Sequence, residues 1–354
     1  MSAQIIRNAR LSNGSHVDVY LKDGTVEKTE TRDATALTND ADFDAKGQLL
    51  LPALAEPHAH LDKAFLAERI HNPTGDLMGA IHAVHENAHT LTFDDIVERA
   101  SRAIKIYVKN GVTRIRTHAD TFDGSTLQVR ALRQVAVNFN DICDIEICAL
   151  IQWPLTGKKG EPSRILAERA RADGADLIGG CPHLDTDPAG ANKVFLSLAK
   201  DLDCNLDLHV DETLNAEMLS LRDLAKRIIA KAPQFSVTAS HCVSLGMQTK
   251  KMQRQVAQLV AEANIAVVTL PQTNLYLQGR EHQSAMPRAL TALSALREAG
   301  VTVMAGGDNL QDPFNPMGRA DPLEAAALLV SAGHYFPEDA YAAVSSKVHE
   351  CIAK

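Results

Sequence analysis

Two histidines separated by one residue, His58 and His60, lie in the segment Glu56-Pro-His-Ala-His60. Side chains two positions apart on an extended segment point to the same side, so both imidazoles can reach one metal ion. This pair alone is weak support for a metal site, because surface loops also carry histidines by chance. A third histidine, His209, precedes Glu212 by three residues, so the imidazole would bind a metal while the carboxyl group transfers protons.

Two further polar residues stand after short apolar runs. His241 follows residues 235–238, and Asp308 follows Gly306-Gly307, where the small residues would leave room for a ligand. Each residue alone would more often be a hydrogen-bonded polar group in a loop. Their placement is informative together with the first three histidines, because four predicted strands would then end in chemical groups. These groups would meet in a parallel barrel, whose active site lies at the carboxyl ends of the strands.

Eight short apolar runs alternate with longer amphipathic segments along the chain. The predicted strands cover residues 49–54, 112–117, 145–151, 177–178, 206–208, 235–238, 265–269 and 301–304. The predicted helices between them cover residues 93–110, 125–137, 161–173, 190–201, 216–231, 247–263 and 287–299. The first run is uninterrupted, as expected of a strand buried on both faces. Strand–helix units in series predict an α/β fold, a (β/α)8 barrel of the TIM type, followed by one helix over residues 322–347.

Residues 1–48 predict a small, sandwich-like β domain, because short strands are broken by Asn13-Gly14 and Asp23-Gly24, which favour tight hairpin turns. Residues 49–354 would form the barrel. Residues 346–354 are too few to add strands after it, so we expect the β domain to be incomplete without a carboxyl-terminal return. A homo-oligomer that covers the unpaired sheet edge would follow.

Composition indicates an ordinary globular protein, with 45% hydrophobic and 23% charged residues. The net charge of -8 comes from 44 acidic and 36 basic residues without a basic run, which favours a small-molecule partner over nucleic acid or a membrane. We expect a cytoplasmic protein, because the sequence lacks a signal-peptide pattern and any apolar window of about 18 residues. The six cysteines form no CxxC pair, which favours free thiols.

The order of these motifs resembles the amidohydrolase superfamily, and the sequence is similar to its cytosine deaminase branch from about residue 4 to residue 345. The matching segments are Glu56-Pro-His-Ala-His-Leu-Asp62, Thr117-His-Ala-Asp120, Cys181-Pro-His183, His209-Val-Asp-Glu212, Ala239-Ser-His-Cys242, Leu277-Gln-Gly-Arg280 and Gly307-Asp-Asn-Leu-Gln-Asp-Pro313. The metal motif is typical of the whole superfamily, whereas the last two segments resemble the cytosine deaminase branch in particular.

This resemblance implies one divalent ion, Zn(II) or Fe(II). Its ligands would be His58, His60, His209 and Asp308. The resemblance also implies that Glu212 shuttles protons and that His241 orients the nucleophile or the departing group. Binuclear relatives carry a carboxylated lysine after the fourth strand, where this sequence has Cys181-Pro-His183. A mononuclear centre is therefore expected.

The chemistry expected of such a centre is attack of water on a stable conjugated ring. A divalent ion lowers the pKa of bound water from about 16 to about 7. Asp308 would accept the proton of this water, and Glu212 would pass a proton to the ring before ammonia leaves. The predicted function is hydrolytic deamination of a small nitrogen heterocycle, a cytosine-like aminopyrimidine or related ring, by a hydrolase of carbon–nitrogen bonds other than peptide bonds.

The substrate contacts depart from the cytosine deaminase pattern. Those enzymes place a glutamine after the proline that follows the third strand, whereas this sequence has Leu155, and Gln152 would have to reach the pocket from the strand. The acid after the metal aspartate is Asn309 here, and Phe314 would supply an aromatic group. His183 would meet either the substrate or the backbone. The candidate substrate contacts are Lys63, Gln152, Trp153, Leu155, His183, Asn309 and Phe314.

Two alternatives remain. The segments His60-Leu-Asp-Lys63-Ala-Phe65 and Asp308-Asn-Leu-Gln-Asp312 resemble s-triazine amidohydrolases, which implies removal of an N-alkylamine from a ring such as N-isopropylammelide. Lys63 would then either meet an electron-rich oxygen of the substrate or be a solvated loop residue. The other alternative is a barrel that binds a small molecule or a metal without turnover. Glu212 argues against it, because a binding protein needs no proton shuttle.

Overall fold

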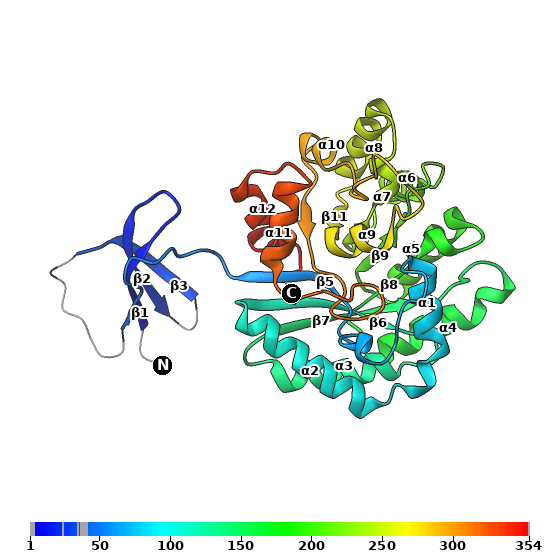
Figure 1. The fold of residues 1–354 in the computed structure, drawn as a ribbon, viewed down its shortest axis with the longest axis horizontal. Helices are drawn as coiled ribbons and strands as arrows, with labels where there is room; N and C mark the ends of the chain where they lie inside the picture. The colour runs from blue at the N-terminus through cyan, green and yellow to red at the C-terminus, as the bar shows by residue number, and fades with distance from the viewer. Residues whose placement is uncertain (1–3, 23–24, 34, 36–41, 353–354) are drawn as a thin grey trace. The chain divides into compact units, whose positions relative to one another are not determined.

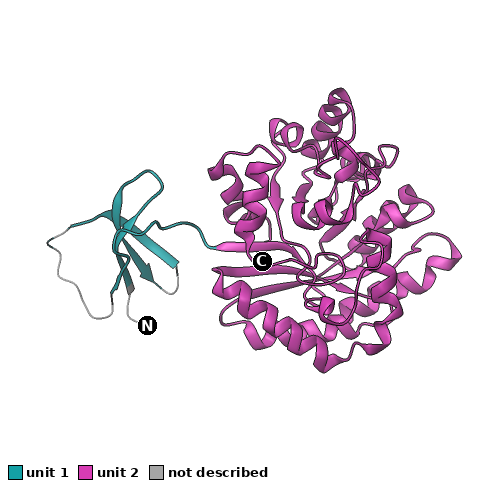
Figure 2. Cartoon of the chain, viewed as in Figure 1, with its two compact units in different colours: residues 1–53 teal, residues 54–354 magenta. Residues whose placement is uncertain are grey.

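The computed structural model describes residues 4–22, 25–33, 35 and 42–352. Two units separate along the chain, Met1–Ala53 and Leu54–Lys354 (Figure 2). The turn predicted at Asp23-Gly24 lies outside the described residues.

The described part of the amino-terminal unit is one sheet with the strand order β3-β2-β1-β4. Strands β1 (Gln4–Arg10), β2 (His16–Lys22) and β3 (Thr25–Thr31) pair antiparallel, and the short β4 (Phe43–Asp44) pairs parallel to β1. The turn predicted at Asn13-Gly14 joins β1 to β2, and Gly14 has a φ of 86° there, which glycine adopts without strain. A small core stabilises the sheet, made of Ala9, Val17, Val19 and Ala45.

The second unit is a sheet of eight parallel strands, β5 to β12, each hydrogen-bonded to the next and surrounded by helices (Figure 1). The strands are β5 (Leu54–Ala59), β6 (Val112–Asp120), β7 (Asp144–Ile151), β8 (Leu177–Gly180), β9 (Leu206–Val210), β10 (Val237–His241), β11 (Ala266–Thr269) and β12 (Val303–Ala305). The predicted (β/α)8 barrel is confirmed.

The first and last strands of the barrel meet at their carboxyl ends. Ala59 and Asp308 form a parallel bridge there. The Asp308 N–H donates to the carbonyl of His58 at 3.1 Å, and the His60 N–H donates to the carbonyl of Asp308 at 3.1 Å. Three predicted metal ligands are therefore held by the backbone bonds that join these strands.

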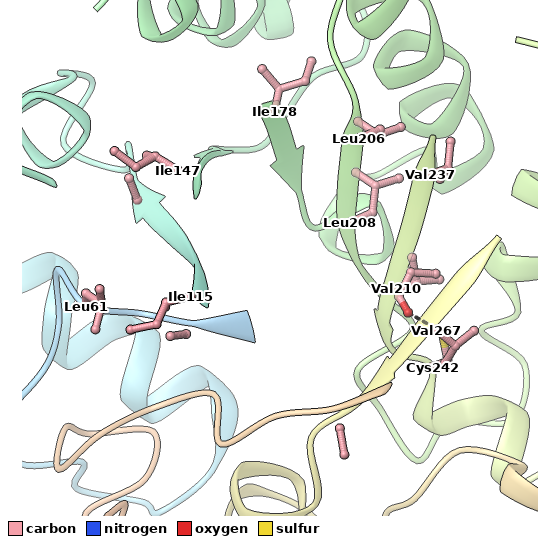
Figure 3. Close-up of a cluster of buried hydrophobic side chains, with 14 of the residues drawn as sticks. Leu61, Ile115, Ile147, Ile178, Leu206, Leu208, Val210, Val237, Cys242 and Val267 are labelled. Carbon is pink, nitrogen blue, oxygen red and sulfur yellow. Dashed lines mark hydrogen bonds between the residues drawn. The ribbon is translucent and has the colours of Figure 1, made fainter. Parts of the chain in front are cut away.

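Strand β9 shows how the barrel separates the hydrophobic core from the polar interior. Successive side chains of a strand point to opposite faces. Leu206, Leu208 and Val210 belong to the hydrophobic cluster that strands and surrounding helices share (Figure 3). Asp207 and His209 face the other way, and Asp207 bonds with Arg116 of β6 across the interior. The alternation of residue types along β9 thus places the polar groups on one inner face.

The helices follow the strands around the barrel. They are α1 (Leu77–Glu86), α2 (Phe93–Lys109), α3 (Leu127–Phe139), α4 (Glu161–Ala172), α5 (Pro188–Asp201), α6 (Ser220–Lys231), α7 (Val243–Gly246), α8 (Lys250–Glu262), α9 (Pro271–Leu277), α10 (Leu293–Glu298), α11 (Pro322–Ser331), α12 (Pro337–Ala343) and α13 (Ser346–Cys351). Helix α2 begins where Thr92 Oγ1 accepts the Asp95 N–H at 3.3 Å, and Gly111, with a φ of 85°, follows its end.

Three predicted strands are shifted in the structure, among them the eighth, which is Val303–Ala305 rather than 301–304. The first barrel strand is Leu54–Ala59 rather than 49–54, because the Leu50 N–H donates to the carbonyl of Arg10 at 2.8 Å and so extends the amino-terminal sheet. The sixth strand is Val237–His241 rather than 235–238. His58 and His241 therefore lie on strands, where their side-chain directions are more restricted than in the loops that follow.

The predicted helices after residue 280 are shorter than expected. Residues 322–347 contain three helices instead of one, since Gly333 and Pro337 interrupt the pattern, and the helix predicted over 287–299 is limited to Leu293–Glu298. All six cysteines are free thiols, as expected. Among the described residues, no helix has the length and hydropathy that crossing a bilayer would require.

Candidate active site

Four side chains converge at the carboxyl end of the barrel. Nε2 of His209 lies 3.2 Å from Nε2 of His58 and 3.2 Å from Nε2 of His60. Oδ1 of Asp308 lies 3.3 Å from His60 Nε2 and 3.6 Å from His58 Nε2. The structure thus brings together the four residues predicted as metal ligands.

The spacing of these atoms fits one tetrahedral ion. Zinc–nitrogen bonds of about 2.0–2.1 Å imply about 3.3 Å between neighbouring ligand atoms. Both carboxylate oxygens of Asp308 are buried without a hydrogen-bond donor in the described part of the chain. An unpaired buried carboxylate is unfavourable, and a cation would compensate it. The donor set and its geometry therefore fit a divalent metal.

Burial sets the protonation of these groups in the protein without metal. It lowers the pKa of His58, His60 and His209 well below the usual histidine value. Neutral imidazoles keep the lone pair that a metal requires. Burial also raises the pKa of Asp308 well above the usual value, and a positive ion would favour its ionised form.

A buried chain of hydrogen bonds orients His58 from behind. Its Nδ1 lies 2.9 Å from Ser240 Oγ, and the Ser240 hydroxyl donates to Asp207 Oδ1 at 3.0 Å. Because this hydroxyl donates to a carboxylate, its lone pair accepts the Nδ1–H of His58, which leaves Nε2 bare toward the ion site. Arg116 anchors the chain, donating to Asp207 at 2.9 Å and to Glu146 at 2.7 Å.

We expect the substitution Ser240→Ala to weaken metal binding about 10–100-fold, because His58 loses the partner that selects its tautomer. Competition with a chromophoric chelator measures the metal dissociation constant of the purified protein. Ser236→Ala is the matched control, since Ser236 is an exposed serine just before the same strand, and it should leave the constant unchanged. Equal constants for both variants would contradict the orienting role of Ser240.

Glu212 and His241 lie beside the ion site. Glu212 Oε1 is 3.5 Å from His241 Nδ1, and both side chains are buried. Burial, followed by the charge of Asp308, raises the pKa of Glu212 well above its usual value. Asn274 Oδ1 accepts the Nδ1–H of His241 at 3.0 Å, so Nε2 of His241 carries the lone pair. The site offers a carboxyl group that holds a proton next to an imidazole that accepts hydrogen bonds.

The Glu56 carboxylate forms hydrogen bonds to both segments that carry His58 and Asp308. Its Oε1 accepts the His58 N–H at 3.1 Å, and its Oε2 accepts the Gly307 N–H at 3.0 Å. A Cβ at Gly306 would lie 2.3 Å from Glu56 Oε1. The glycines before Asp308 therefore make room for Glu56, whereas the sequence had suggested room for a ligand.

A pocket of about 510 Å³, part of it open to solvent, is lined in part by the ion site. Its lining residues are His60, Lys63, Leu77, Ile81, Val84, His85, Asp120, Phe122, Leu150, Trp153, Cys181, Leu184, His209, Glu212, His241, Asp308, Asn309 and Phe314. Three rings form an aromatic wall. The ring centroid of Phe122 lies 4.5 Å from that of His85 and 4.6 Å from that of Trp153. Apolar and aromatic walls with a few polar groups are typical of a site for a small ring compound.

Lys63 supplies a buried cation to this pocket. Its Nζ lies 3.5 Å from Asp62 Oδ2 and 3.4 Å from Asp120 Oδ2. Burial alone would lower the pKa of Lys63, but the two carboxylates outweigh burial and raise it. Lys63 and Asp120 both line the pocket, so a bound ring would meet a donor and an acceptor side by side.

The predicted substrate contacts divide into two groups. Those that line the pocket are Lys63, Trp153, Asn309 and Phe314. Leu155 does not, because it packs in the hydrophobic core, where its N–H donates to Asp185 at 2.6 Å. Gln152 does not line the pocket either, although its neighbour Trp153 does. His183 lies just outside, with its Nδ1 bonded to a backbone carbonyl.

One wall of the pocket was not predicted from the sequence. Helix α1 supplies it, with Leu77, Ile81 and Val84 among the lining residues. Two features of the sequence indicate this helix. Asp76 can cap it, and in the structure its carboxylate accepts the Gly79 N–H at 2.8 Å. The apolar residues that follow are spaced four and three apart, as on one face of a helix. Asp207 was missed as well, although a charged residue inside an apolar strand requires a buried partner.

These features define a class of protein, a (β/α)8 barrel with a histidine and carboxylate site for a metal at the carboxyl ends of its strands. A family model described as the amidohydrolase family matches residues 65–349. The chain belongs to this family, as the resemblance in the sequence had implied. It is therefore an enzyme, and the alternative of a barrel without turnover is set aside.

Particular relatives support this assignment. A pterin deaminase from Rhizobium rhizogenes (strain K84) is 30% identical over 311 residues, which cover 87% of this chain and 70% of that protein. An N-isopropylammelide isopropyl amidohydrolase from Pseudomonas sp. (strain ADP) is 25% identical over 340 residues, 92% of this chain and 78% of that protein. The crystal structure of 5-methylcytosine deaminase from Klebsiella pneumoniae with 5-fluorocytosine has a TM-score of 0.90 at 27% identity, covering 99% of this chain and 86% of that one.

Proposed function

We propose that this enzyme hydrolytically deaminates a small nitrogen heterocycle that carries amino and oxo groups. The observation that carries the proposal is that buried Glu212 and His241, 3.5 Å apart, line the same pocket as His60, His209 and Asp308 of the ion site. The relatives named for deamination of pterin and of 5-methylcytosine support the same reaction.

The ion would be Zn(II) or Fe(II), and when bound it supplies the Lewis acidity that brings the pKa of water to about 7. The residues proposed to hold it are His58, His60, His209 and Asp308. Asp308 accepts a proton from the attacking water. Glu212 donates its proton to the ring nitrogen and, now ionised, carries the proton of the added hydroxyl group to the amino group, which leaves as ammonia while the carbonyl forms. The proton held by Asp308 then returns to Glu212. His241 Nε2 accepts a hydrogen bond from the water or from the departing amine.

The pocket favours a flat ring with a polar edge. Phe122 and Trp153 provide aromatic contact for the ring faces. The ammonium group of Lys63 donates to an oxo group, and the neighbouring Asp120 carboxylate accepts from a ring N–H or an amino group. Pterins, aminopyrimidines and amino-oxo triazines all present such an edge.

A second candidate is the removal of an alkylamine from an amino-oxo triazine. The apolar side of helix α1, where Leu77, Ile81 and Val84 line the pocket, would accommodate the alkyl group. The similarity to an N-isopropylammelide isopropyl amidohydrolase supports this reaction.

The test is a substrate panel with enzyme reconstituted with zinc or with iron. Pterin, cytosine, 5-methylcytosine, ammelide and N-isopropylammelide are incubated with the enzyme, and ammonia and isopropylamine are measured separately. We expect ammonia from at least one amino-oxo ring. Isopropylamine without ammonia would favour the second candidate, and release of neither amine with either metal would overturn the proposal.

A further inference from the structure

An outer chamber adjoins the substrate pocket. It lies mainly among residues 74–78, 183–184, 212–218 and 277–282 and holds about 1730 Å³, part of it open to solvent. Leu77, Leu184 and Glu212 line both the pocket and the chamber. These shared residues place the chamber directly beside the pocket.

His183 presents a buried acceptor to the outer chamber. Its side chain is 7% exposed, and its Nε2 has no hydrogen-bond partner within the described ranges of the chain. Its Nδ1 lies 3.0 Å from the carbonyl oxygen of His209, which can only accept. Nδ1 therefore carries the proton, and Nε2 carries a bare lone pair.

Gln278 presents a second buried acceptor to the same chamber. Its Nε2 donates to Asn274 Oδ1 at 3.4 Å, and this bond orients the amide. Its Oε1 is buried and, as far as the described residues extend, lacks a donor. Buried polar atoms in native proteins almost always have partners, and a donating group bound in the chamber that His183 and Gln278 line would supply partners for both acceptors.

We propose that the substrate ring carries a neutral hydrogen-bond-donating substituent, a hydroxyalkyl or aminoalkyl group, which enters the outer chamber and donates to His183 Nε2 and Gln278 Oε1. The inference rests on the proposed deaminase function and specifies its substrate class. A methyl substituent would leave both acceptors unpaired, and a carboxylate would meet two lone pairs. Arg280 also lines the chamber, but its charge is exposed to solvent and Asp76 and Glu281 line the same chamber, so it does not reverse this preference.

The first test compares substrates with the unmodified enzyme. Pterin, 6-methylpterin, 6-hydroxymethylpterin and pterin-6-carboxylate differ only at one ring position, and the same substituents are placed on a pyrimidine or triazine if that ring is the one deaminated. We expect kcat/KM for the hydroxymethyl compound to exceed that for the methyl compound about tenfold and the carboxylate to be poorest. Equal values for methyl and hydroxymethyl compounds would overturn the inference while the deaminase function stands. Deamination of no ring would overturn both.

The second test uses Gln278→Met, which removes the acceptor at similar size, and His183→Asn as an independent variant. The readout is the ratio of kcat/KM between hydroxymethyl and methyl compounds, which does not depend on the fraction of folded enzyme. We expect the ratio to fall toward one in both variants. The fall should come from a higher KM for the hydroxymethyl compound. A ratio that keeps its original value in either folded variant would contradict the role of that residue.

Discussion

Replacing Glu212 with glutamine is expected to lower kcat by about 10²–10⁴-fold while the metal content of the enzyme stays the same. Glutamine keeps the size of the side chain but has no proton to transfer at neutral pH. Glu212 stands outside the four converging groups, so its loss removes proton transfer without removing a ligand. Steady-state ammonia release and metal analysis on the same sample measure the two quantities.

Glu217→Gln is the matched control for this experiment. Glu217 is an exposed residue in the loop that follows Glu212, so the same chemical change there should leave kcat within about twofold of the unmodified enzyme. Unchanged kcat in Glu212→Gln would contradict the proton-transfer role. Loss of metal together with activity would instead indicate that Glu212 is a ligand.

The second large effect is expected for Arg116→Met, which should lower the free energy of unfolding by about 3–5 kcal/mol. The Arg116 side chain is 3% exposed and pairs with Asp207, which is 0% exposed, and with Glu146. Burial alone would lower the pKa of Arg116, but the two carboxylates outweigh burial and raise it. Methionine would leave these carboxylates buried without their cation, which is why the effect is large.

Urea unfolding of the metal-free protein measures this loss as a shift of the transition midpoint. Arg227→Met is the control, because Arg227 pairs with Asp223 on the surface of α6 with side chains 29% and 33% exposed, and such pairs contribute about 0–1 kcal/mol. Similar shifts for both variants would show that the interior ion pair is not a stabilising contact. A weaker metal affinity in Arg116→Met would follow from its contact with Asp207, which orients Ser240 and His58.

The barrel and the convergence of the four predicted ligands could be predicted because the relevant patterns are local. A short apolar run followed by an amphipathic segment, repeated along the chain, has few stable arrangements other than a parallel barrel. In that fold the carboxyl ends of all strands lie together, so His209 and Asp308 were expected to meet although 99 positions separate them, from 209 to 308. Residue type and position at a strand end were sufficient for this inference.

The predictions differed from the structure where the local sequence pattern does not specify which distant residues a segment contacts. The run Leu49–Leu54 is apolar whichever sheet it joins, and backbone bonds to Arg10 assign its first residues to the amino-terminal sheet. Leu155 occupies the sequence position of a substrate contact, but packing places it in the hydrophobic core. Neither choice can be made from neighbours in the sequence, because the competing contacts involve residues far away in the chain.

The sequence by itself determined the class of fold, the four groups that converge at one end of the barrel and the acid beside them, since strand and helix periodicities and residue chemistry are properties of short segments. Only the tertiary structure decided which tautomer His58 adopts, that helix α1 forms a pocket wall, and that His183 and Gln278 leave acceptors unpaired in an outer chamber. These features depend on distances between groups from different strands and loops, and such distances are set when the barrel packs and its first and last strands meet.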